Sequence, residues 1–593
     1  MSENLLAVWA ELLFDALAQA GVTDVVVSPG SRSTPFVLAA AGDARLRLHD
    51  VIDERAAGFF ALGQARVTGR PALLLCTSGS AGAHYLPAVI EARHAGVPLL
   101  VLTADRPVEL HGCGANQTID QRALFAGYAR ATFDLGTPDG SPAALRALRR
   151  AAVQAVHATR WPTPGAAHLN APARKPLEPR AASTPEGHAL AALAHALRAT
   201  PPTLAAPPVA APDPVALDAI AALCLRARRG LLVAGPASVE QAEASAAVAA
   251  LGAATGFALA AEATSQLRTS AVRTVGAFDL LLRSPHFRAE QPPDLIVQLG
   301  AAPTSAGLEQ LLSERPDIVR VVIAPHEWPD PCGSATHLLV ADVGEAADAL
   351  ARSVMRLRGA PAPEPSAYAS RLAAADALCW RLVDADLAAS AATLEEGAVV
   401  RQTVAALHER AWFAIGNSLP VRHVDAFCPT LPPGVRVLSQ RGVSGIDGLL
   451  AGAAGAASAT DRPVTLLLGD VSFLHDVGGL ALARHARAPL CIVVINNDGG
   501  RIFEQLPLAR AGQAAALPHF TTPHGLDLSY AAELYGLRFL RASTRDALAS
   551  ALHEAHARPG ATVVEAVVPP HAAAAQQARI AAALENALMR RLP

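Results

Sequence analysis

The segments RPVTLLLGDVSFLHD (Arg462–Asp476) and APLCIVVINNDGG (Ala488–Gly500) decide the fold of the last third of this chain. Each contains an apolar run as long as one buried strand, and Gly, Asp or Asn follows directly after the run. Asp470 and Asn497 are 27 positions apart, which is room for one helix and the return strand of a βαβ unit. The sequence therefore predicts neighbouring parallel strands with polar residues at their carboxyl ends.

Similar apolar runs alternate with Ala- and Leu-rich helical stretches along the whole chain. This alternation is typical of parallel sheets with helices on both faces, so we expect an α/β fold. The predicted strands are Val25–Val27, Ala72–Cys76, Leu99–Thr103, Gly230–Ala234, Asp294–Leu299, Ile318–Ile323, Trp412–Ile415, Val435–Leu438, Val464–Leu468, Cys491–Ile495 and Thr562–Val567.

Two Pro- and Ala-rich segments divide these strands into three groups. PPTLAAPPVAAPDP begins at Pro201 and RGAPAPEP begins at Arg358, and neither can continue a helix or a central strand. We expect three doubly wound parallel-sheet domains, covering residues 1–180, 181–365 and 366–593.

The composition excludes several classes of protein. Lys plus Arg (49) nearly balance Asp plus Glu (52), so no broad field exists to hold nucleic acid or an anionic membrane. The seven cysteines are scattered and form no CxxC pair, which argues against a disulfide framework or a zinc cluster and favours a reducing cytosol. No apolar run is long enough to span a membrane, and the N-terminal stretch predicts an amphipathic helix rather than a signal peptide. We expect a cytoplasmic protein.

The polar strand ends predict a metal site. Ligands of open parallel sheets lie beyond the carboxyl ends of the strands. Asp470 offers a carboxylate, Asn497 an amide oxygen and Gly499 a backbone carbonyl, and such hard oxygen ligands suit magnesium, with diphosphate oxygens and water completing the octahedron. Taken singly, each motif is also compatible with an ordinary turn, since Gly, Asn and Asp are common turn residues.

A thiamine diphosphate site needs a second element, a carboxyl group that exchanges a proton with the aminopyrimidine ring. Glu54 is the candidate, because it stands at a predicted helix start and is followed by the apolar residues of AAGFFAL. Such surroundings favour the protonated, donating form. The alternative is that Asp53 and Glu54 only complement the helix dipole.

Seven ordered blocks of this sequence resemble one family, the menaquinone-pathway synthases known as MenD, which are thiamine diphosphate enzymes. The resemblance covers nearly the whole chain and is densest in the first and last thirds. The blocks are SPGSRSTP (Ser28–Pro35), DERAAGFFALG (Asp53–Gly63), CTSGSAG (Cys76–Gly82), ADRPVELHGCGANQTIDQ (Ala104–Gln121), GNSLPVR (Gly416–Arg422), SQRGVSGIDG (Ser439–Gly448) and GDVSFLHD with NNDGGRIFEQLP (from Gly469 and Asn496).

The resemblance implies the pyruvate decarboxylase-like architecture, with an N-terminal pyrimidine-binding domain, a central Rossmann-like domain without a nucleotide site and a C-terminal diphosphate- and magnesium-binding domain. It implies a transferase that decarboxylates 2-oxoglutarate and adds the succinyl unit to isochorismate in menaquinone biosynthesis. It also implies a homodimer or homotetramer with sites shared between subunits.

The resemblance further implies roles for individual residues. Asp470, Asn497 and the Gly499 carbonyl would bind magnesium, with manganese as the alternative metal, and Glu54 would contact the pyrimidine. Ser418 and Arg422 would hold the succinyl carboxylate, since an arginine fork suits a carboxylate. The other expected cofactor-binding residues are Asn417, Ile446, Ser472, Ile502 and Phe503. The expected isochorismate-binding residues are Arg32, Arg106 and Arg441, with Ser31, Asn116 and Gln117 as neutral partners.

Some positions depart from the family. Ala306 stands where relatives often carry a lysine thought to help bind the second substrate, and His84 stands where many have Asn. Val471 replaces the Gly of broader thiamine enzymes, which agrees with this family. Two alternatives stay open. The first is another thiamine enzyme of the acetohydroxyacid synthase or 2-oxoacid decarboxylase type, which would have less need of arginines to bind its substrates. The second is a non-catalytic relative, against which the retained Glu54, Asp470 and Asn497 argue.

Overall fold

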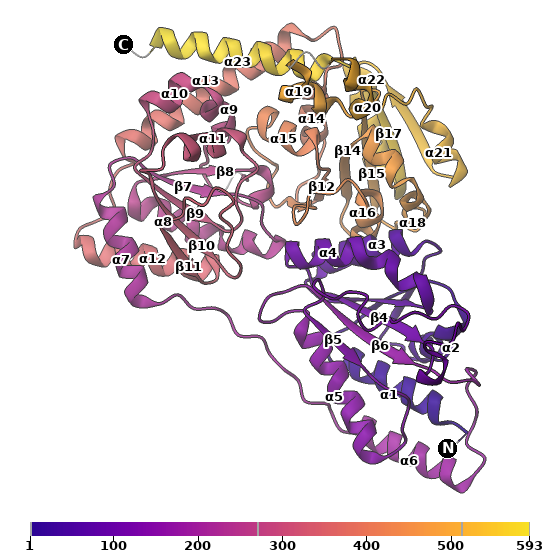
Figure 1. Ribbon diagram of the computed structural model, residues 1–593. Coiled ribbons are helices and arrows are strands. Elements are labelled where there is room, and N and C mark those ends of the chain that lie inside the picture. Colours follow the sequence, from indigo (N-terminus) through magenta and orange to yellow (C-terminus); the bar gives the residue numbers. More distant parts are fainter. Residues whose placement is uncertain (1–2, 270–271, 511–513, 592–593) are drawn as a thin grey trace. The chain divides into compact units, whose positions relative to one another are not determined.

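The computed structural model describes residues 3–269, 272–510 and 514–591. Seventeen strands in this described part of the chain form three sheets, and every pairing is parallel (Figure 1). The chain packs as two compact units. One unit comprises Met1–Pro208, Gln440–Thr460 and Asp476–His485, and the other comprises Val209–Ser439, Asp461–His475 and Ala486–Pro593.

The first unit contains a six-stranded sheet in the order β2-β1-β3-β4-β6-β5. Its strands are β1 (Asp24–Val27), β2 (Arg47–Asp50), β3 (Ala72–Cys76), β4 (Leu99–Asp105), β5 (Ala131–Asp134) and β6 (Ala166–Pro172). Its helices are α1 (Leu5–Gln19), α2 (Thr34–Ala41), α3 (Glu54–Thr68), α4 (Leu86–Ala95), α5 (Pro142–Ala158), α6 (Pro185–Ala199), α16 (Leu449–Ser458) and α18 (Leu480–Ala483).

The helices of this unit cover both faces of the sheet. Helix α1 is the predicted amphipathic helix, and its buried side packs with α2, α5 and α6 on one face. Helices α3 and α4 contact the strands from the other side. Strands β3 and β4 are buried along their whole length, as expected for central parallel strands.

Glycines bring α3 and α16 into unusually close contact. A Cβ atom at Gly455 would lie 1.9 Å from the carbonyl oxygen of Phe60, and one at Gly63 would lie 1.9 Å from that of Gly452. The residue before α16, Gly448, has φ +66° and would place a Cβ 1.8 Å from the Phe59 ring. The helix that begins with Glu54 is therefore held by backbone-to-backbone packing.

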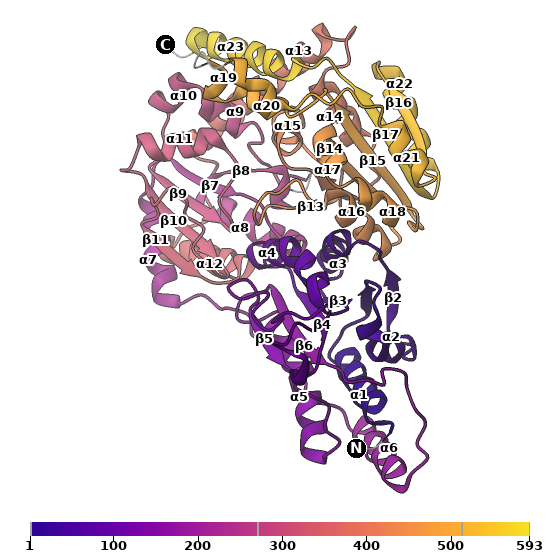
Figure 2. The same ribbon diagram turned by 45° about the vertical axis from the view of Figure 1, so that its right-hand side comes forward.

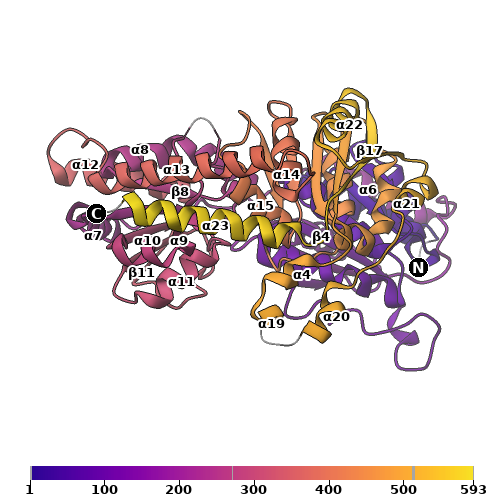
Figure 3. The same cartoon turned by 90° about the horizontal axis from the view of Figure 1, so that it is seen from above.

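The second unit contains two sheets, of which the first is five-stranded in the order β11-β10-β9-β7-β8. Its strands are β7 (Gly230–Ala234), β8 (Ala258–Ala261), β9 (Leu295–Leu299), β10 (Val319–Ala324) and β11 (His337–Val340). Helices α7 (Pro214–Arg226), α8 (Ser245–Thr255) and α12 (Val343–Arg358) pack on one face. The other face carries α9 (Phe278–Arg283), α10 (Pro285–Glu290), α11 (Ala306–Glu314), α13 (Ala367–Ala389) and α23 (Ala572–Arg591). Helices α13 and α23 lie side by side (Figure 3).

The other sheet of this unit has six strands in the order β13-β12-β14-β15-β17-β16 (Figure 2). Its strands are β12 (Trp412–Ile415), β13 (Arg436–Ser439), β14 (Val464–Gly469), β15 (Pro489–Asn496), β16 (Arg538–Ala542) and β17 (Gly560–Val567). Helices α14 (Glu396–Ala405), α15 (Leu419–Phe427) and α22 (Arg545–Ala557) cover one face. The remaining helices are α17 (Asp470–His475), α19 (Pro507–Arg510), α20 (Leu517–Thr521) and α21 (Ser529–Leu534).

The α/β fold with three parallel sheets is confirmed, and each of the eleven predicted strands is present within a few residues. Six strands were not predicted, namely β2, β5, β6, β8, β11 and β16. The Pro-rich residues 201–213 and 359–366 form neither helix nor strand. The boundaries at 180 and 365 stay a prediction. Within the described residues, no helix has the length and apolarity of a membrane span.

Candidate functional site

The candidate site lies at the carboxyl edge of the β13-β12-β14-β15-β17-β16 sheet. Strand order reverses between β12 and β14, because β13 lies on one side of β12 while β14 and β15 lie on the other. At such a switch point the loops diverge and leave a crevice, where open α/β sheets bind ligands. The two loops here are Gly416–Ser418, after β12, and Asp470, after β14.

Asp470 is the first residue of α17 and is 2% exposed. Its Oδ1 accepts a hydrogen bond from the Val471 N–H at 2.7 Å, and its Oδ2 accepts one from the Gly499 N–H at 2.8 Å. Burial raises the pKa of this carboxyl group, and these two N–H donors and His524 oppose the rise. A divalent cation would offset the same desolvation.

Asn497 is oriented by a residue from α14. Its Nδ2 donates to Oε1 of Glu396 at 2.7 Å, and both side chains are buried. Oε2 of Glu396 lies 3.1 Å from Nδ1 of His423. Among the described residues no donor reaches the buried Oδ1 of Asn497. An orphaned buried amide oxygen is costly, and a cation ligand would satisfy it.

The Asn496–Gly500 turn, which we call the metal loop, requires glycine at one position. Gly499 has φ +126°, and a Cβ there would lie 2.2 Å from the Thr521 carbonyl oxygen. Arg501 fastens the turn: its Nε donates to the Asn497 carbonyl at 3.0 Å and its Nη2 to the Asp498 carbonyl at 2.7 Å. The Gly499 carbonyl accepts from the Arg501 N–H at 2.9 Å and keeps a second lone pair for another ligand.

These three oxygens fit the predicted metal. The carboxylate of Asp470, the orphaned amide oxygen of Asn497 and the carbonyl of Gly499 lie on the ends of adjacent strands β14 and β15. One charge and two neutral oxygens leave room for the phosphate and water ligands with which Mg²⁺ usually completes its shell. The residues present therefore fit a magnesium–diphosphate group.

Ser418 and Arg422 lie across the switch point on the β12 side. Ser418 precedes α15 with φ +69°, an uncommon conformation for a residue with a side chain. Arg422, half-buried in α15, donates from Nη1 to the Ser418 carbonyl at 2.7 Å. Burial lowers the pKa of Arg422, and the charge of Arg283 adds to the lowering. The charges of Asp279, Glu262 and Glu309 oppose this lowering. No ion pair between Arg422 and an acidic side chain is present among the described residues, so its guanidinium can still bind an anion.

The other predicted site residues of the second unit lie in these loops or next to them. Ser472 is buried in α17, and Asn417 is buried between β12 and α15. Ile502 and Phe503 are half-buried in the 3-10 helix Arg501–Gln505 that follows the metal loop. Phe503 packs against Phe520 with 5.7 Å between the ring centroids. Ala306 opens α11 beside α9.

In the first unit, Glu54 is the first residue of α3 and is half-buried. Asp53 caps this helix by accepting from the Arg55 N–H at 2.9 Å, so helix capping falls to Asp53 rather than to Glu54. Burial raises the pKa of Cys76, and the negative charge of Glu54 raises it further. Glu54 therefore lies close to buried groups of this unit.

The arginines predicted for the second substrate all lie in the first unit. Arg32 is buried and donates from Nη1 to the Ala173 carbonyl at 2.6 Å. Within the described residues the buried Nε atoms of Arg32 and Arg106 have no acceptor. Arg441 lies in a loop held by Glu91, whose carboxylate accepts from the N–H groups of Gly442 and Val443 at 3.1 and 2.8 Å.

The neutral residues of this predicted set are less enclosed. Ser31, Asn116 and Gln117 are exposed, and Ile446, in the loop before α16, is half-buried. Gln117 is nevertheless fixed, because its Nε2 donates to the Ser78 carbonyl at 3.2 Å and its own carbonyl accepts from Ser78 Oγ at 2.9 Å. The roles of these residues stay predictions.

The structure adds residues that the sequence reading missed. Glu396, Arg501 and His524 each bond to Asp470 or to the metal loop. Arg501 directly follows the NNDGG motif, so its position in the sequence could have indicated that it lies near the site. Glu396 is 101 positions from Asn497, and His524 is 54 positions from Asp470. No local sequence pattern indicates either residue.

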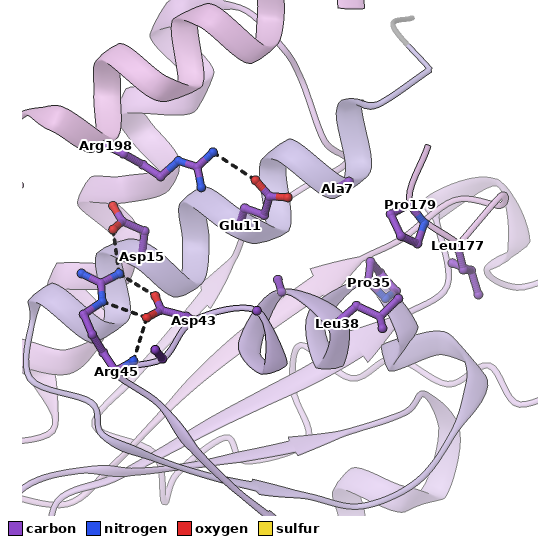
Figure 4. Close-up of a pocket in the computed structure, with 13 residues that line it drawn as sticks. Ala7, Glu11, Asp15, Pro35, Leu38, Asp43, Arg45, Leu177, Pro179 and Arg198 are labelled. Carbon is purple, nitrogen blue, oxygen red and sulfur yellow. Dashed lines mark hydrogen bonds and ion pairs between the residues drawn. The ribbon is translucent and has the colours of Figure 1, made fainter. Parts of the chain in front are cut away.

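The first unit also contains a pocket of about 390 Å³ between α1, α2 and the segment after β6 (Figure 4). None of the predicted site residues lines it. Its arginines are neutralised by its own carboxylates: Arg198 pairs with Glu11 at 3.1 Å and Arg45 with Asp15 at 2.8 Å. The pocket therefore offers little for recognition of an anionic substrate.

Comparison with known proteins agrees with this geometry. The family model described as the thiamine pyrophosphate enzyme N-terminal TPP binding domain matches residues 8–124, and the corresponding C-terminal TPP binding domain matches residues 427–566. A solved benzoylformate decarboxylase from Polynucleobacter necessarius shares the fold, with a TM-score of 0.70, 17% identity and coverage of 95% of this chain and 98% of that chain. Fold and matched domains define a thiamine diphosphate-dependent enzyme.

Full-length relatives narrow the class. A protein of Sorangium cellulosum is 49% identical over 97% of this chain and 95% of its own length. Proteins of Myxococcus xanthus and a Roseiflexus species are 41% and 38% identical, covering 93% and 94% of this chain and 92% and 94% of their own lengths. All three carry the name 2-succinyl-5-enolpyruvyl-6-hydroxy-3-cyclohexene-1-carboxylate synthase. This chain belongs to that synthase family.

Proposed function

We propose that this protein is a thiamine diphosphate-dependent transferase that decarboxylates 2-oxoglutarate and adds the succinyl unit to isochorismate. The product would be 2-succinyl-5-enolpyruvyl-6-hydroxy-3-cyclohexene-1-carboxylate, in menaquinone biosynthesis. The observation that carries the proposal is the pair of groups that follow the adjacent strands β14 and β15: the buried carboxylate of Asp470 and the orphaned Oδ1 of Asn497. They lie in a domain that matches the C-terminal TPP binding domain.

In this proposal Asp470, Asn497 and the Gly499 carbonyl hold Mg²⁺, with Mn²⁺ as a substitute, and the metal neutralises the diphosphate. Bound thiamine diphosphate supplies a carbon nucleophile that also accepts the electrons released by decarboxylation of a 2-oxo acid. Asn417 and Ser472 would bind the cofactor through hydrogen bonds. Ile446, Ile502 and Phe503 would surround it with apolar surface and exclude water.

Glu54 would exchange a proton with the pyrimidine ring. Its place at the first turn of α3 is fixed by the Asp53 cap and by the glycine contacts between α3 and α16. A proton donor needs such fixed geometry, since a hydrogen-bond reach of about 3 Å must be met before acid strength matters.

The dicarboxylate substrates would be held by arginines. Ser418 and Arg422 would bind the distal carboxylate of 2-oxoglutarate, which fits an arginine without an acidic partner among the described residues. Arg32, Arg106 and Arg441 would face isochorismate with Ser31, Asn116 and Gln117. Ala306 supplies no charge, so these arginines would balance the second substrate without a lysine at that position.

We further propose a homodimer or homotetramer with sites at the subunit interface, which is the arrangement expected from the resemblance to this family. The seven cysteines are free, which agrees with a cytoplasmic location. The domain ranges 1–180, 181–365 and 366–593 form part of this proposal as its pyrimidine-binding, central and diphosphate-binding domains.

The test is to incubate the protein with thiamine diphosphate, Mg²⁺, 2-oxoglutarate and isochorismate and to identify the product by mass spectrometry. Glu54→Gln should lower turnover by at least about 100-fold, the range ascribed to general acid–base groups. The matched control is Glu186→Gln, a first-turn glutamate of α6 outside the predicted site. Full turnover of 2-oxoglutarate by Glu54→Gln would refute the mechanism, and pyruvate as the preferred donor would favour an acetohydroxyacid synthase.

A further inference from the structure

The segment Thr521–Leu526, which we call the outer loop, is bonded to the metal loop at several points. The Gly500 N–H donates to the Thr521 carbonyl at 2.7 Å. The carboxylate of Asp498 accepts at Oδ1 from the N–H groups of His524 and Gly525, at 2.9 and 2.8 Å. The backbone of His524 is thereby fixed relative to the residues predicted to bind the metal.

The hydrogen bonds of the His524 ring define its tautomer. Its Nδ1 accepts the Leu526 N–H at 3.0 Å, so the proton of the neutral ring resides on Nε2. Nε2 lies 3.2 Å from Oδ2 of Asp470, and the side chain of His524 is 10% exposed. His524 therefore donates to the buried carboxylate rather than accepting from it.

The two carboxylate oxygens of Asp470 accept different numbers of hydrogen bonds. Oδ2 receives the Gly499 N–H and the His524 Nε2–H, which use both of its in-plane lone pairs. Oδ1 receives the Val471 N–H and keeps one lone pair open. Because the donors bind different oxygens of the carboxylate, rotation about χ2 would break at least one of these bonds.

We propose that His524 is a positioning residue for the metal site: its Nε2–H holds the Asp470 carboxylate in the rotation that presents the open lone pair of Oδ1 to a divalent cation. The inference rests on the proposed function, since it concerns the same cation. Partners that orient a ligand in this way typically change metal affinity 10- to 100-fold when removed.

Two substitutions separate this role from simple packing of the outer loop. The oxygen of Asn lies near the position of Nδ1, so His524→Asn retains an acceptor for the Leu526 N–H and loses the donor to Asp470. The amide nitrogen of Gln lies near the position of Nε2, so His524→Gln retains that donor. His519→Asn is the matched control, because His519 is exposed in the neighbouring helix α20.

The experiment is titration of the metal-free full-length protein with MnCl₂ by calorimetry, at saturating thiamine diphosphate and without substrates. We expect His524→Asn to bind Mn²⁺ about tenfold or more weakly than the unsubstituted protein. His524→Gln should stay within about threefold, and His519→Asn should be unchanged. Thermal unfolding of each metal-free variant checks that the fold is intact.

Equal Mn²⁺ affinity for His524→Asn and the unsubstituted protein would overturn the inference. So would a tenfold loss in a folded His524→Gln variant, a result that decides the matter even if His524→Asn fails to fold. Failure of the unsubstituted protein to bind Mn²⁺ with the cofactor would instead refute the proposed function.

Discussion

Glu396 fixes the orientation of Asn497: the amide nitrogen of Asn497 donates to Oε1 of Glu396 at 2.7 Å, and the amide oxygen is left without a donor among the described residues. An ionised carboxylate accepts hydrogen bonds and cannot donate them, so it selects one of the two amide orientations. A residue of α14 thereby decides which atom the metal loop presents.

Glu396→Gln should weaken Mn²⁺ binding about tenfold. A glutamine can donate as well as accept, so the amide of Asn497 could adopt either orientation, and in one of them its Oδ1 would face the glutamine instead of the metal. Calorimetric titration with thiamine diphosphate measures the change. Glu395→Gln is the matched control, since Glu395 pairs with Arg579 at 2.8 Å and makes no bond to the metal loop. Unchanged affinity in Glu396→Gln would show that Asn497 is oriented by other contacts.

Gly499→Ala should both destabilise the protein and reduce cofactor binding. The new Cβ would lie 2.2 Å from the Thr521 carbonyl, at φ +126°. Backbone strain of this kind costs about 1–3 kcal/mol before the clash is counted. The measurements are thermal unfolding and quenching of intrinsic fluorescence by thiamine diphosphate.

Gly536→Ala separates the effect of backbone strain from that of a steric clash. Gly536 also has positive φ (+65°), but no atom of the described residues lies within 4 Å of the place that a Cβ would take. The substitution should cost about 1–2 kcal/mol and leave cofactor binding unchanged. Equal cofactor binding by both variants would mean that the metal loop tolerates displacement.

Alanine substitutions at two glycines of α16 should change the free energy of unfolding in opposite directions. Gly455→Ala places a Cβ 1.9 Å from the Phe60 carbonyl and should cost about 1–3 kcal/mol or more through overpacking. Gly452→Ala meets atoms no closer than 3.6 Å and should be neutral or stabilising by up to about 1 kcal/mol. Thermal unfolding compares them, and similar midpoints would contradict the close α3–α16 contact.

Acid should destabilise the first unit through His168. Burial lowers the pKa of this fully buried imidazole from 6.5 to about 4. Between these values the unfolded chain binds the proton and the folded chain does not, so stability falls as pH drops from 6.5 toward 4, by on the order of 3 kcal/mol.

His168→Gln should flatten this part of the pH profile of the unfolding free energy, measured by urea denaturation between pH 4 and 7. Replacement of the exposed His195 by Asn serves as the control and should leave the slope unchanged. A slope in His168→Gln equal to that of the unsubstituted protein would assign the acid sensitivity to other groups.

Arg422→Gln should lower kcat/KM for 2-oxoglutarate by about 10- to 100-fold, the worth of one or two hydrogen bonds to a charged group. The reaction with 2-oxopentanoate, which has the same length and no distal carboxylate, is the matched control and should change little. Decarboxylation rates measure both, and an equal loss with both donors would place Arg422 outside the carboxylate site.

The functional strand ends, and the central strands other than β6, were determined by the sequence itself. A strand buried on both faces is usually a continuous apolar run, and the residues after neighbouring parallel strands share one edge of the sheet. The positions of β14 and β15, and of Asp470 and Asn497 at their ends, therefore follow from the local pattern. The central strand β6 was missed because its run AAHLNAP is interrupted by the buried polar residues His168 and Asn170. Five of the six unpredicted strands, β2, β5, β8, β11 and β16, are edge strands. An edge strand is less enclosed and needs no apolar run, as RLHD in β2 illustrates.

Tertiary structure alone decided which groups orient the predicted ligands. Glu396 and His524 approach Asn497 and Asp470 from distant parts of the chain, and their residue types carry no signal of that approach. The close α3–α16 contact likewise depends on glycines that read as ordinary helix residues. The physical reason is that a hydrogen-bond partner or a steric limit is a property of position in space, which packing fixes only after the strands and helices have assembled.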